Sequence, residues 1–329
     1  MTADKLVSVI IPVYNAAVHL QKTLAAIIAQ DYDNIEIIIV DDAYTDSSLE
    51  IAQKVLLESA RPHRIISLSQ NLGVSCARNF GLMAANGDFV WFCDADDLPD
   101  ANFLNIMCSE ALHKNSDLVF CAFSHYFEDN GTFVDMKIFA DNFSSPQEYF
   151  KAWANGKIYL LSAWNFIFRR DFLRENNLLF FEGCIYGEDS EFVIKAIASA
   201  SKISFVRDIL YTYVHHKNQT ILRRKEYSMM HSLWLARFRM LRVVLRKAKD
   251  RCVIHYVLSF CIPDMLVDKL TACAKLGYRN YYFRSLKHSK VRNLLSASVR
   301  VIAQKPELFF KAIALLYAPK LYYLLRKEK

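Results

Sequence analysis

The amino-acid sequence predicts an α/β fold built on a mostly parallel β-sheet with helices on both faces. Over about the first 120 residues, short apolar runs alternate with segments whose apolar residues recur at helical spacing. This alternation is typical of strands joined by right-handed helical crossovers. Polar clusters follow three of the apolar runs, and ligands bind parallel sheets beyond the carboxyl ends of their strands. The sequence therefore predicts both the fold and the edge of the sheet at which a site would lie.

The order of elements follows from these patterns. The expected strands of the first part cover residues 6–13, 35–40, 63–68, 88–93 and 117–123. The expected helices cover residues 16–30, 47–60, 71–85 and 99–114, with Pro99 in the first turn of the last one. Beyond residue 123 we expect a hairpin over 124–140, a helix over 145–155, an apolar aromatic segment over 159–169, a short helix beginning with Glu188 and Asp189, and strands over 203–206 and 209–214.

Composition and charge bound the class of protein. Apolar residues make up 53% of the 329 residues and charged residues 23%, which indicates a globular protein with a large core. The net charge of +7 is unevenly distributed. Residues 222–329 carry 24 Lys and Arg against 6 Asp and Glu, or +18, which leaves 17 against 28, or −11, for residues 1–221. The acidic part suits cation chemistry, and the basic part suits an anionic surface.

Cysteine spacing and hydropathy exclude several other classes. None of the eight cysteines forms a Cys-x-x-Cys pair and several lie in apolar runs, so we expect reduced cysteines in a cytoplasmic protein and no zinc site. The first residues lack the apolar region of a signal peptide. No apolar run reaches the length of a transmembrane helix.

The strand that ends at Cys93 runs into three carboxylates, Asp94, Asp96 and Asp97. Carboxylates this close repel one another, and a divalent cation is the usual reason to place them after a central strand. Mg²⁺ or Mn²⁺ suits such a site, because these ions take few protein carboxylates and fill other positions with water and phosphates. The alternative is a solvated, Asp-rich turn. This interpretation would need a separate explanation for the polar residues after each of three strands.

The pattern of the basic part, residues 222–329, predicts helices. Trp234, Phe238, Leu241 and Leu245 recur at helical spacing between arginines. After Lys305-Pro306 a final segment combines apolar residues with flanking cations; its apolar residues include Leu308, Phe309, Ile313, Leu316, Leu321, Tyr322, Leu324 and Leu325. We interpret this as an amphipathic anchor for anionic lipid, with a helical cap on the catalytic domain or on a second protomer as the alternative.

Several short motifs occur together in one order and resemble the inverting, nucleotide-sugar-dependent glycosyltransferases of family 2, which have the GT-A fold. They are Pro12-x-Tyr14-Asn15, Val40-Asp41-Asp42, Asn71-x-Gly73-x-x-x-Ala77-Arg78-Asn79, Gly87-Asp88, Asp94-x-Asp96-Asp97, Trp164-Asn165, Glu188-Asp189 and His215-His216. The resemblance covers about residues 6–220, and it is carried by the combination rather than by any single motif. One departure is that Ala43-Tyr44 stands where the family usually has Gly-Ser.

The resemblance implies a domain organisation and a donor site. It implies a GT-A domain over residues 1–220, with a nucleotide-binding half over 1–123 and an acceptor-binding half over 124–220; residues 221–329 would associate with a membrane. The implied nucleotide-binding residues are Pro12, Tyr14, Asp42, Arg78, Asp94 and Ala95. An aromatic face such as that of Tyr14 suits a uracil ring, and an arginine suits negative charge.

The resemblance also implies the metal site and the catalytic base. Asp96 and His216, with His215 as the alternative to His216, would hold Mn²⁺ or Mg²⁺. Inversion requires a single base on the acceptor side, for which Asp189 is the candidate, with Glu188 beside it. Trp164 and Asn165 would contact the acceptor.

The expected function is therefore transfer of a hexose or N-acetylhexosamine from a UDP-sugar to a hydroxyl of a lipid-linked glycan or lipopolysaccharide. The enzyme would act at the inner face of the cell membrane, without a nucleic-acid partner, and self-association is left open. One alternative is a sugar-phosphate nucleotidyltransferase, but Pro12-Val13-Tyr14-Asn15 is not the Gly-rich, basic loop that such an enzyme would need after its first strand. A non-catalytic protein that binds membranes or other anions through the +18 part is the other alternative.

Overall fold

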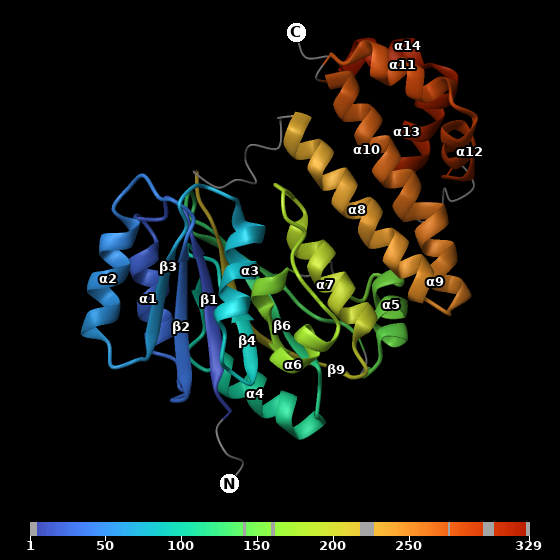
Figure 1. Ribbon diagram of the computed structural model, residues 1–329. Coiled ribbons are helices and arrows are strands. Elements are labelled where there is room, and N and C mark those ends of the chain that lie inside the picture. Colours follow the sequence, from blue (N-terminus) through green and yellow to red (C-terminus); the bar gives the residue numbers. More distant parts are fainter. Residues whose placement is uncertain are drawn as a thin grey trace. The chain divides into compact units, whose positions relative to one another are not determined.

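The computed structural model describes residues 5–140, 143–158, 162–217, 227–275, 277–298 and 306–326. The chain forms two compact units, residues 1–219 and residues 220–329. Figure 1 labels most of the elements of both.

The first unit is built on one sheet, which contains nine strands among the described residues in the order β3-β2-β1-β4-β8-β6-β9-β5, with β7 paired to β6. β1, β2, β3, β4, β6 and β9 run in one direction, because their pairings are parallel or pass through the antiparallel β8. β5, β7 and β8 run the other way, so the sheet is mostly parallel, as predicted. The strands are β1 Val7–Val13, β2 Ile35–Asp41, β3 His63–Ser67, β4 Phe89–Phe92, β5 Leu98–Pro99, β6 Leu118–Phe127, β7 Thr132–Met136, β8 Phe166–Arg169 and β9 Ile203–His215.

The strand order creates a place for a ligand. The chain moves outward from β1 through β2 to β3 and then returns to β4 on the other side of β1. Right-handed crossovers put α1 and α2 on one face and α3 on the other, and Figure 1 shows helices on both sides of the sheet. The carboxyl ends of β1 and β4 therefore flank a topological switch point, where ligands bind in open α/β sheets. The helices of this unit are α1 Leu20–Ile28, α2 Ser48–Glu58, α3 Val74–Ala84, α4 Phe103–Lys114, α5 Pro146–Ala154, α6 Arg170–Glu175 and α7 Glu188–Ser199, with the short 3₁₀ turn η1 Ala163–Asn165.

Burial explains why these segments form strands. Every described side chain of β4 is buried, as are all those of β1 except the half-buried Pro12. Strands buried on both faces read as continuous apolar runs, which is why the sequence pattern located them. The hairpin expected around residues 129–131 is present as β6 and β7.

Two expectations about secondary structure were wrong. Pro99 lies in the short strand β5, paired with Tyr211, and α4 begins only at Phe103. The two strands expected over 203–206 and 209–214 are one strand, β9, whose pairing with β6 shifts register between Cys121 and Phe123. The polar Arg207-Asp208 pair interrupts the apolar pattern, but the pairing with β6 continues beyond it. The start of the aromatic segment at Tyr159 lies outside the described residues.

The second unit is helical. It contains α8 Tyr227–Lys247, α9 Arg251–Tyr256, the π-helical turn η3 Val257–Cys261, α10 Ile262–Lys275, α11 Arg279–Lys287, α12 Ser289–Ser298, α13 Pro306–Tyr317 and α14 Pro319–Arg326. These helices share a core that includes Trp234, Leu270, Tyr282, Leu316 and Tyr322. None of the described helices is both long enough and apolar enough to cross a membrane.

This core changes the interpretation of the final segment. Leu316 and Tyr322, expected on a lipid-facing surface, are buried within the unit, whereas Leu321 is exposed. The side chains of Leu308, Phe309, Leu324 and Leu325 lie outside what is described, as do residues 218–226, 299–305 and 327–329. The last helices therefore contribute side chains to the core of this unit, and membrane binding by this segment stays a prediction.

Candidate active site

The predicted site residues gather at the carboxyl edge of the sheet in the first unit. Tyr14 follows β1 and is 50% exposed, so its ring is available to stack against a flat base. Asp41 ends β2 and Asp42 follows it, and Asp94 to Asp97 come after β4. His215 ends β9, whose direction is the same, and His216 follows it.

Asp42 shapes the loop that leads into α3. Its carboxylate accepts hydrogen bonds from the backbone N–H groups of Leu72, at 2.7 Å, and Gly73, at 2.8 Å. Burial raises the pKa of Asp42, and these two hydrogen bonds oppose that shift. Gly73 has φ +88°, a conformation that favours glycine, so the tight approach to Asp42 depends on this residue.

A polar network ties the ends of β1 and β2 together beside Tyr14. The side-chain oxygen of Asn15 accepts from the Thr45 N–H at 2.8 Å, and Asp46 accepts from the Ala17 N–H at 3.1 Å. Ala43 adopts φ +57° at the position where the resemblance expects glycine. An alanine in this region costs about 1–2 kcal/mol, and the hydrogen bonds around it hold the loop in place.

Arg78, on α3, links three carboxylates from two other parts of the chain. Its guanidinium lies 2.7 Å from Asp94, forms a short ion pair with Oδ1 of Asp189, and lies 3.6 Å from Glu188. Only 3% of the Arg78 side chain is exposed, and its guanidinium also lies over the ring of Phe180. The resemblance implied that Arg78 would neutralise charge near the nucleotide. In the structure its neighbours include Asp94, another predicted nucleotide-binding residue, and Asp189, the predicted base.

Burial and charge set the protonation of this group. Burial raises the pKa of Asp94, Glu188 and Asp189, while the positive charge of Arg78 opposes the shift. For Asp189 the result is a pKa of about 7. Burial alone would lower the pKa of Arg78, but the neighbouring Asp189, Asp94 and Glu188 raise it, so the guanidinium stays charged. A carboxyl group with a pKa near 7 is suited to accept and release a proton in catalysis.

Asp96 and His216 meet as a pair. His216 Nε2 lies 2.8 Å from Asp96 Oδ2 although the residues are 120 positions apart. His215 is bonded instead to His125, at 2.9 Å, and stacks on Phe127, so His216 is the histidine that faces Asp96. Asp97, in contrast, is fully buried and accepts from the Tyr211 hydroxyl and the Val214 N–H, both at 2.9 Å. Of the three carboxylates that follow β4, Asp94 and Asp96 therefore lie in the candidate site, and Asp97 belongs to the core.

The Asp96–His216 pair fits a divalent cation. Two neighbouring ligands of an octahedral Mg²⁺ ion, each about 2.1 Å from the metal, lie about 3 Å apart, which is close to the separation of this pair. A carboxylate oxygen and an imidazole nitrogen are donors that Mn²⁺ accepts. Among the described residues, no group of three His, Cys, Asp or Glu side chains could hold a metal. The remaining positions would therefore fall to water and to the phosphates of a substrate.

Other predicted residues have structural roles. The Ala95 carbonyl oxygen accepts from the Thr23 hydroxyl at 3.1 Å, which fixes the loop after β4. Trp164 is buried and stacks on Tyr211, and Asn165 is fully buried and donates to the Cys121 carbonyl at 2.8 Å. These contacts place Trp164 and Asn165 in the core of the first unit, and contact with the acceptor stays a prediction for both.

The structure also adds residues that sequence reasoning missed. His19 stacks against His216, Glu128 contacts His19, and Phe180 packs against Arg78. None of them belongs to a motif, and each lies far along the chain from the residue it contacts. Burial lowers the pKa of His19, and His216 lowers it further.

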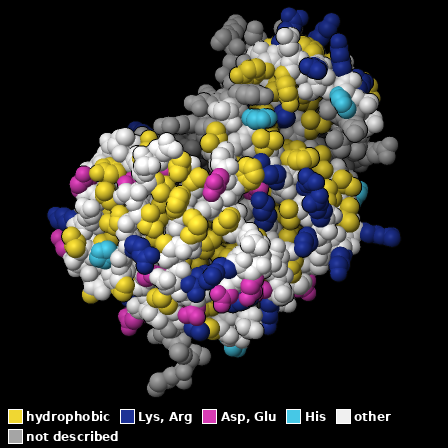
Figure 2. Space-filling view, in the orientation of Figure 1, with side chains coloured by type: hydrophobic (Ala, Val, Ile, Leu, Met, Phe, Trp, Pro, Cys, Tyr) yellow, Lys and Arg dark blue, Asp and Glu magenta, His cyan; other side chains and the backbone are white. Residues whose placement is uncertain are grey.

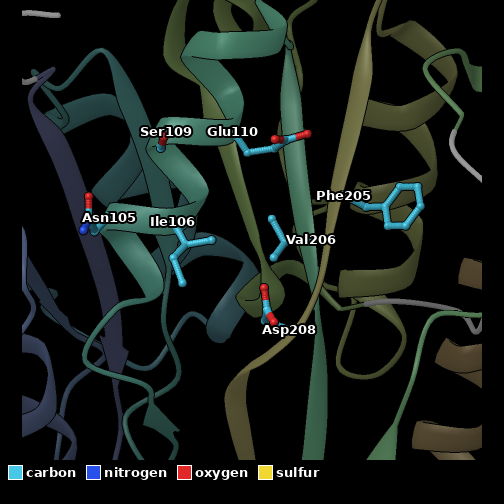
Figure 3. A pocket seen from close by; sticks show the side chains of 7 residues that line it. All are labelled: Asn105, Ile106, Ser109, Glu110, Phe205, Val206 and Asp208. Atoms are coloured by element: carbon cyan, nitrogen blue, oxygen red, sulfur yellow. The ribbon is translucent and has the colours of Figure 1, made fainter.

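A separate hollow lies away from these residues. A cavity of about 410 Å³ is lined by α4 and the first half of β9, and Figure 3 shows Glu110 and Asp208 among its side chains. None of the predicted site residues lines it, and His215 and His216 lie at the opposite end of β9.

Comparisons with known proteins agree with the resemblance drawn from the motifs. The model of glycosyl transferase family 2 matches residues 8–176, slightly more than half of the chain. The uncharacterized glycosyltransferase EpsJ of Bacillus subtilis is 31% identical over 215 residues, which cover 65% of this chain and 62% of EpsJ. This chain thus matches less than two thirds of that relative's length.

Solved structures show the same fold. S. aureus TarS 1–349 in complex with UDP-GlcNAc aligns with a TM-score of 0.62 and 21% identity, over 97% of this chain and 88% of the other. The mannosyltransferase PcManGT of Pyrobaculum calidifontis, in complex with GDP-Man and Mn²⁺, aligns with a TM-score of 0.59 and 19% identity, over 97% of this chain and 89% of the other. At this identity the likeness establishes the GT-A-type fold.

Replacing the buried guanidinium tests its structural role. Arg78→Met leaves three largely buried carboxylates, 15–22% exposed, without their cation, so we expect the free energy of unfolding to fall by about 3 kcal/mol in urea denaturation. Because the pKa of Asp189 is raised in the folded state, protonation of this carboxyl stabilises the fold. This contribution to the free energy of unfolding is present at low pH and is lost as pH rises through about 7. The deficit of Arg78→Met should therefore shrink at low pH, where the carboxyls are protonated. The exposed Arg64 provides a control, and equal stability of Arg78→Met and Arg64→Met at neutral pH would contradict the role of Arg78.

Proposed function

The chain belongs to glycosyl transferase family 2, and on that premise we propose that it is an inverting, metal-assisted enzyme that moves a sugar from a UDP-sugar to a hydroxyl of a glycan acceptor. The single observation that carries the mechanism is the contact of Arg78 with both Asp94 and Asp189. This contact keeps a donor-side carboxylate and an acceptor-side carboxylate at a fixed separation. The family match favours glycosyl transfer over nucleotidyl transfer.

The donor would lie across the carboxyl ends of β1, β2 and β4. Tyr14 presents an exposed ring for the uracil, and Asp42 and Pro12 shape the wall beside it. Asp94 and the backbone at Ala95 face the position proposed for the ribose. The solved structures of TarS and PcManGT are complexes with UDP-GlcNAc and GDP-Man, so nucleotide sugars are ligands of this fold, and UDP is our proposal for this chain.

Asp96 and His216 would hold the divalent cation. When bound, this ion would offset the charge that develops on the departing diphosphate. The PcManGT complex contains Mn²⁺, which supports a divalent ion in this chain without fixing which one it is.

Asp189 would act as the base. Its carboxylate takes the proton of the acceptor hydroxyl as the hydroxyl oxygen bonds to the anomeric carbon from one side. The bond to the diphosphate breaks on the opposite side, so the configuration inverts. Glu188, held by the same guanidinium, orients Asp189, and Arg78 limits the rise of its pKa so that it is substantially ionised near neutral pH.

The helical unit would bring the enzyme to an anionic membrane that carries the acceptor. On α8, Leu235, Phe238, Arg242 and Arg246 follow one another at helical spacing and are all exposed. Figure 2 shows Lys and Arg side chains over this unit among hydrophobic ones. Exposed apolar and basic side chains on one helix face suit the surface of an anionic membrane. We therefore propose a lipid-linked glycan or lipopolysaccharide as the acceptor.

Nucleotide binding tests the donor site. A ligand that binds only the folded state stabilises it by about 2.7 kcal/mol at one hundred times its Kd, which raises the Tm by several degrees. We expect UDP with Mn²⁺ to raise the Tm and GDP with Mn²⁺ to do so much less. Asp96→Ala should lose the effect of Mn²⁺ while keeping that of UDP, and Asp31→Ala, at an exposed carboxylate away from the site, should behave as wild type. A Tm that does not respond to any nucleotide would contradict the proposed donor site.

The pH dependence of turnover tests the base. Because only the ionised form of Asp189 accepts a proton and its pKa is about 7, we expect kcat/KM to rise with pH up to about 7 and then level off. The assay is release of UDP from the UDP-sugar, with water as the acceptor. Asp189→Asn should reduce kcat by about 10²–10⁴-fold and leave UDP binding intact. Full activity of Asp189→Asn, with Asp208→Asn as the control, would exclude Asp189 as the base.

Vesicle binding tests the membrane role. Each cation near an anionic surface contributes about 1 kcal/mol, so Arg242→Gln combined with Arg246→Gln should weaken binding to phosphatidylglycerol vesicles more than tenfold. Both wild type and the variant should bind phosphatidylcholine vesicles much more weakly than wild type binds phosphatidylglycerol vesicles. The exposed Lys114 of the first unit gives a control, Lys114→Gln, that should keep wild-type binding. Equal sedimentation of wild type with both kinds of vesicle would contradict an electrostatic membrane surface.

A further inference from the structure

We propose that His19, held by Glu128, is a positioning residue that fixes the ring of His216 for metal binding. The inference rests on the proposed metal site of Asp96 and His216. It concerns a pair of residues outside every motif of the sequence, one at the start of α1 and the other in the turn between β6 and β7.

The contacts form a continuous row of side chains. The rings of His19 and His216 lie with their centroids 4.2 Å apart at a tilt of 35°. His19 Nδ1 lies 3.5 Å from Glu128 Oε1, and only 13% of the His19 side chain is exposed. Asp96, His216, His19 and Glu128 thus follow one another from the loop after β4 to the β6–β7 turn.

The backbone holds both supporting residues in place. The His19 N–H donates to the Ala16 carbonyl at 3.0 Å, where the chain enters α1. The Glu128 N–H donates to the His215 carbonyl at 3.1 Å, which keeps the β6–β7 turn beside the end of β9. Backbone hydrogen bonds therefore hold the last two residues of the row, His19 and Glu128.

His216 needs such support because few other contacts define its ring. It follows the last residue of β9, so no strand pairing holds it. A metal-binding histidine usually donates its second ring nitrogen to a carboxylate or carbonyl, and this fixes the plane of the ring. In the described structure His216 Nδ1 is buried and has no hydrogen-bond partner. Stacking against His19 can supply the orientation that this missing hydrogen bond would otherwise give.

His19 acts through His216 and not as a ligand itself. Its Nδ1 lies 3.5 Å from Glu128 Oε1, whereas its ring contacts the ring of His216. Among the described residues no group of three His, Cys, Asp or Glu side chains could hold a metal. The flat ring of His19 is therefore the feature that matters for His216.

Mn²⁺ affinity tests the inference without relying on turnover. The free Mn²⁺ signal in electron paramagnetic resonance, recorded on the full chain with saturating UDP, gives the Kd. We expect His19→Ala to weaken Mn²⁺ binding about tenfold, at the lower end of the 10–100-fold effects known for residues that orient metal ligands. His19→Phe, which keeps a flat ring, should restore most of the affinity. His63→Ala, at an exposed histidine on β3, should equal wild type.

The controls separate this inference from the function it rests on. Binding of UDP without metal should be the same in His19→Ala and wild type, which would show that the variant is folded. Wild-type Mn²⁺ affinity in His19→Ala, together with loss of affinity in His216→Ala, would overturn the role of His19 alone. A His19→Phe variant as weak as His19→Ala would overturn the stacking argument. Wild-type affinity in His216→Ala would instead remove the proposed metal site and, with it, this inference.

Discussion

The buried guanidinium of Arg78 is the interaction on which the arrangement of the site depends. A charged group taken out of water costs several kcal/mol unless it is paired and hydrogen-bonded. Asp94 and the pair Glu188-Asp189 supply this pairing together, and among the nitrogen atoms of Arg78 only Nε is buried without a hydrogen-bond partner in the described structure. Removing any one of these carboxylates leaves charge imperfectly balanced in the interior. The ion pairs that offset the cost of burying Arg78 also hold in place the carboxylates that the proposed reaction uses.

The fold delivers these groups from three directions. α3 packs on β1 and β2 and brings Arg78 to the carboxyl edge of the sheet, where β4 ends in Asp94. α7 begins with Glu188 and Asp189, whose charges are favourable at a helix N-terminus. Asp97 does not face the ligand region; with Tyr211 and Val214 it holds the end of β9 against the loop after β4. This contact places His216 beside Asp96, so a core carboxylate positions the proposed metal pair.

The sequence predicted the part of this structure that local patterns encode. Continuous apolar runs located the buried strands, and the polar residues that follow them marked the edge where the site lies. Local patterns failed where pairing partners decide the outcome. Pro99 reads as a helix start but pairs with Tyr211, and the polar residues within β9 do not interrupt its pairing with β6. His19, Glu128 and Phe180 carry no local signal, because their significance comes only from the residues that folding brings beside them. The resemblance assigned the metal to Asp96 and gave Asp97 no role, and the burial of Asp97 shows that its role is structural.

A crystal structure of the chain with UDP and Mn²⁺ tests the central claim most directly, because it shows which groups Arg78 contacts when the donor site is filled. We expect the guanidinium to remain paired with Asp94 and Asp189, Asp96 and His216 to bind the metal, and the uracil to stack on Tyr14. A guanidinium that leaves Asp189 to bind the diphosphate, or a nucleotide bound away from the carboxyl ends of β1 and β4, would contradict this claim.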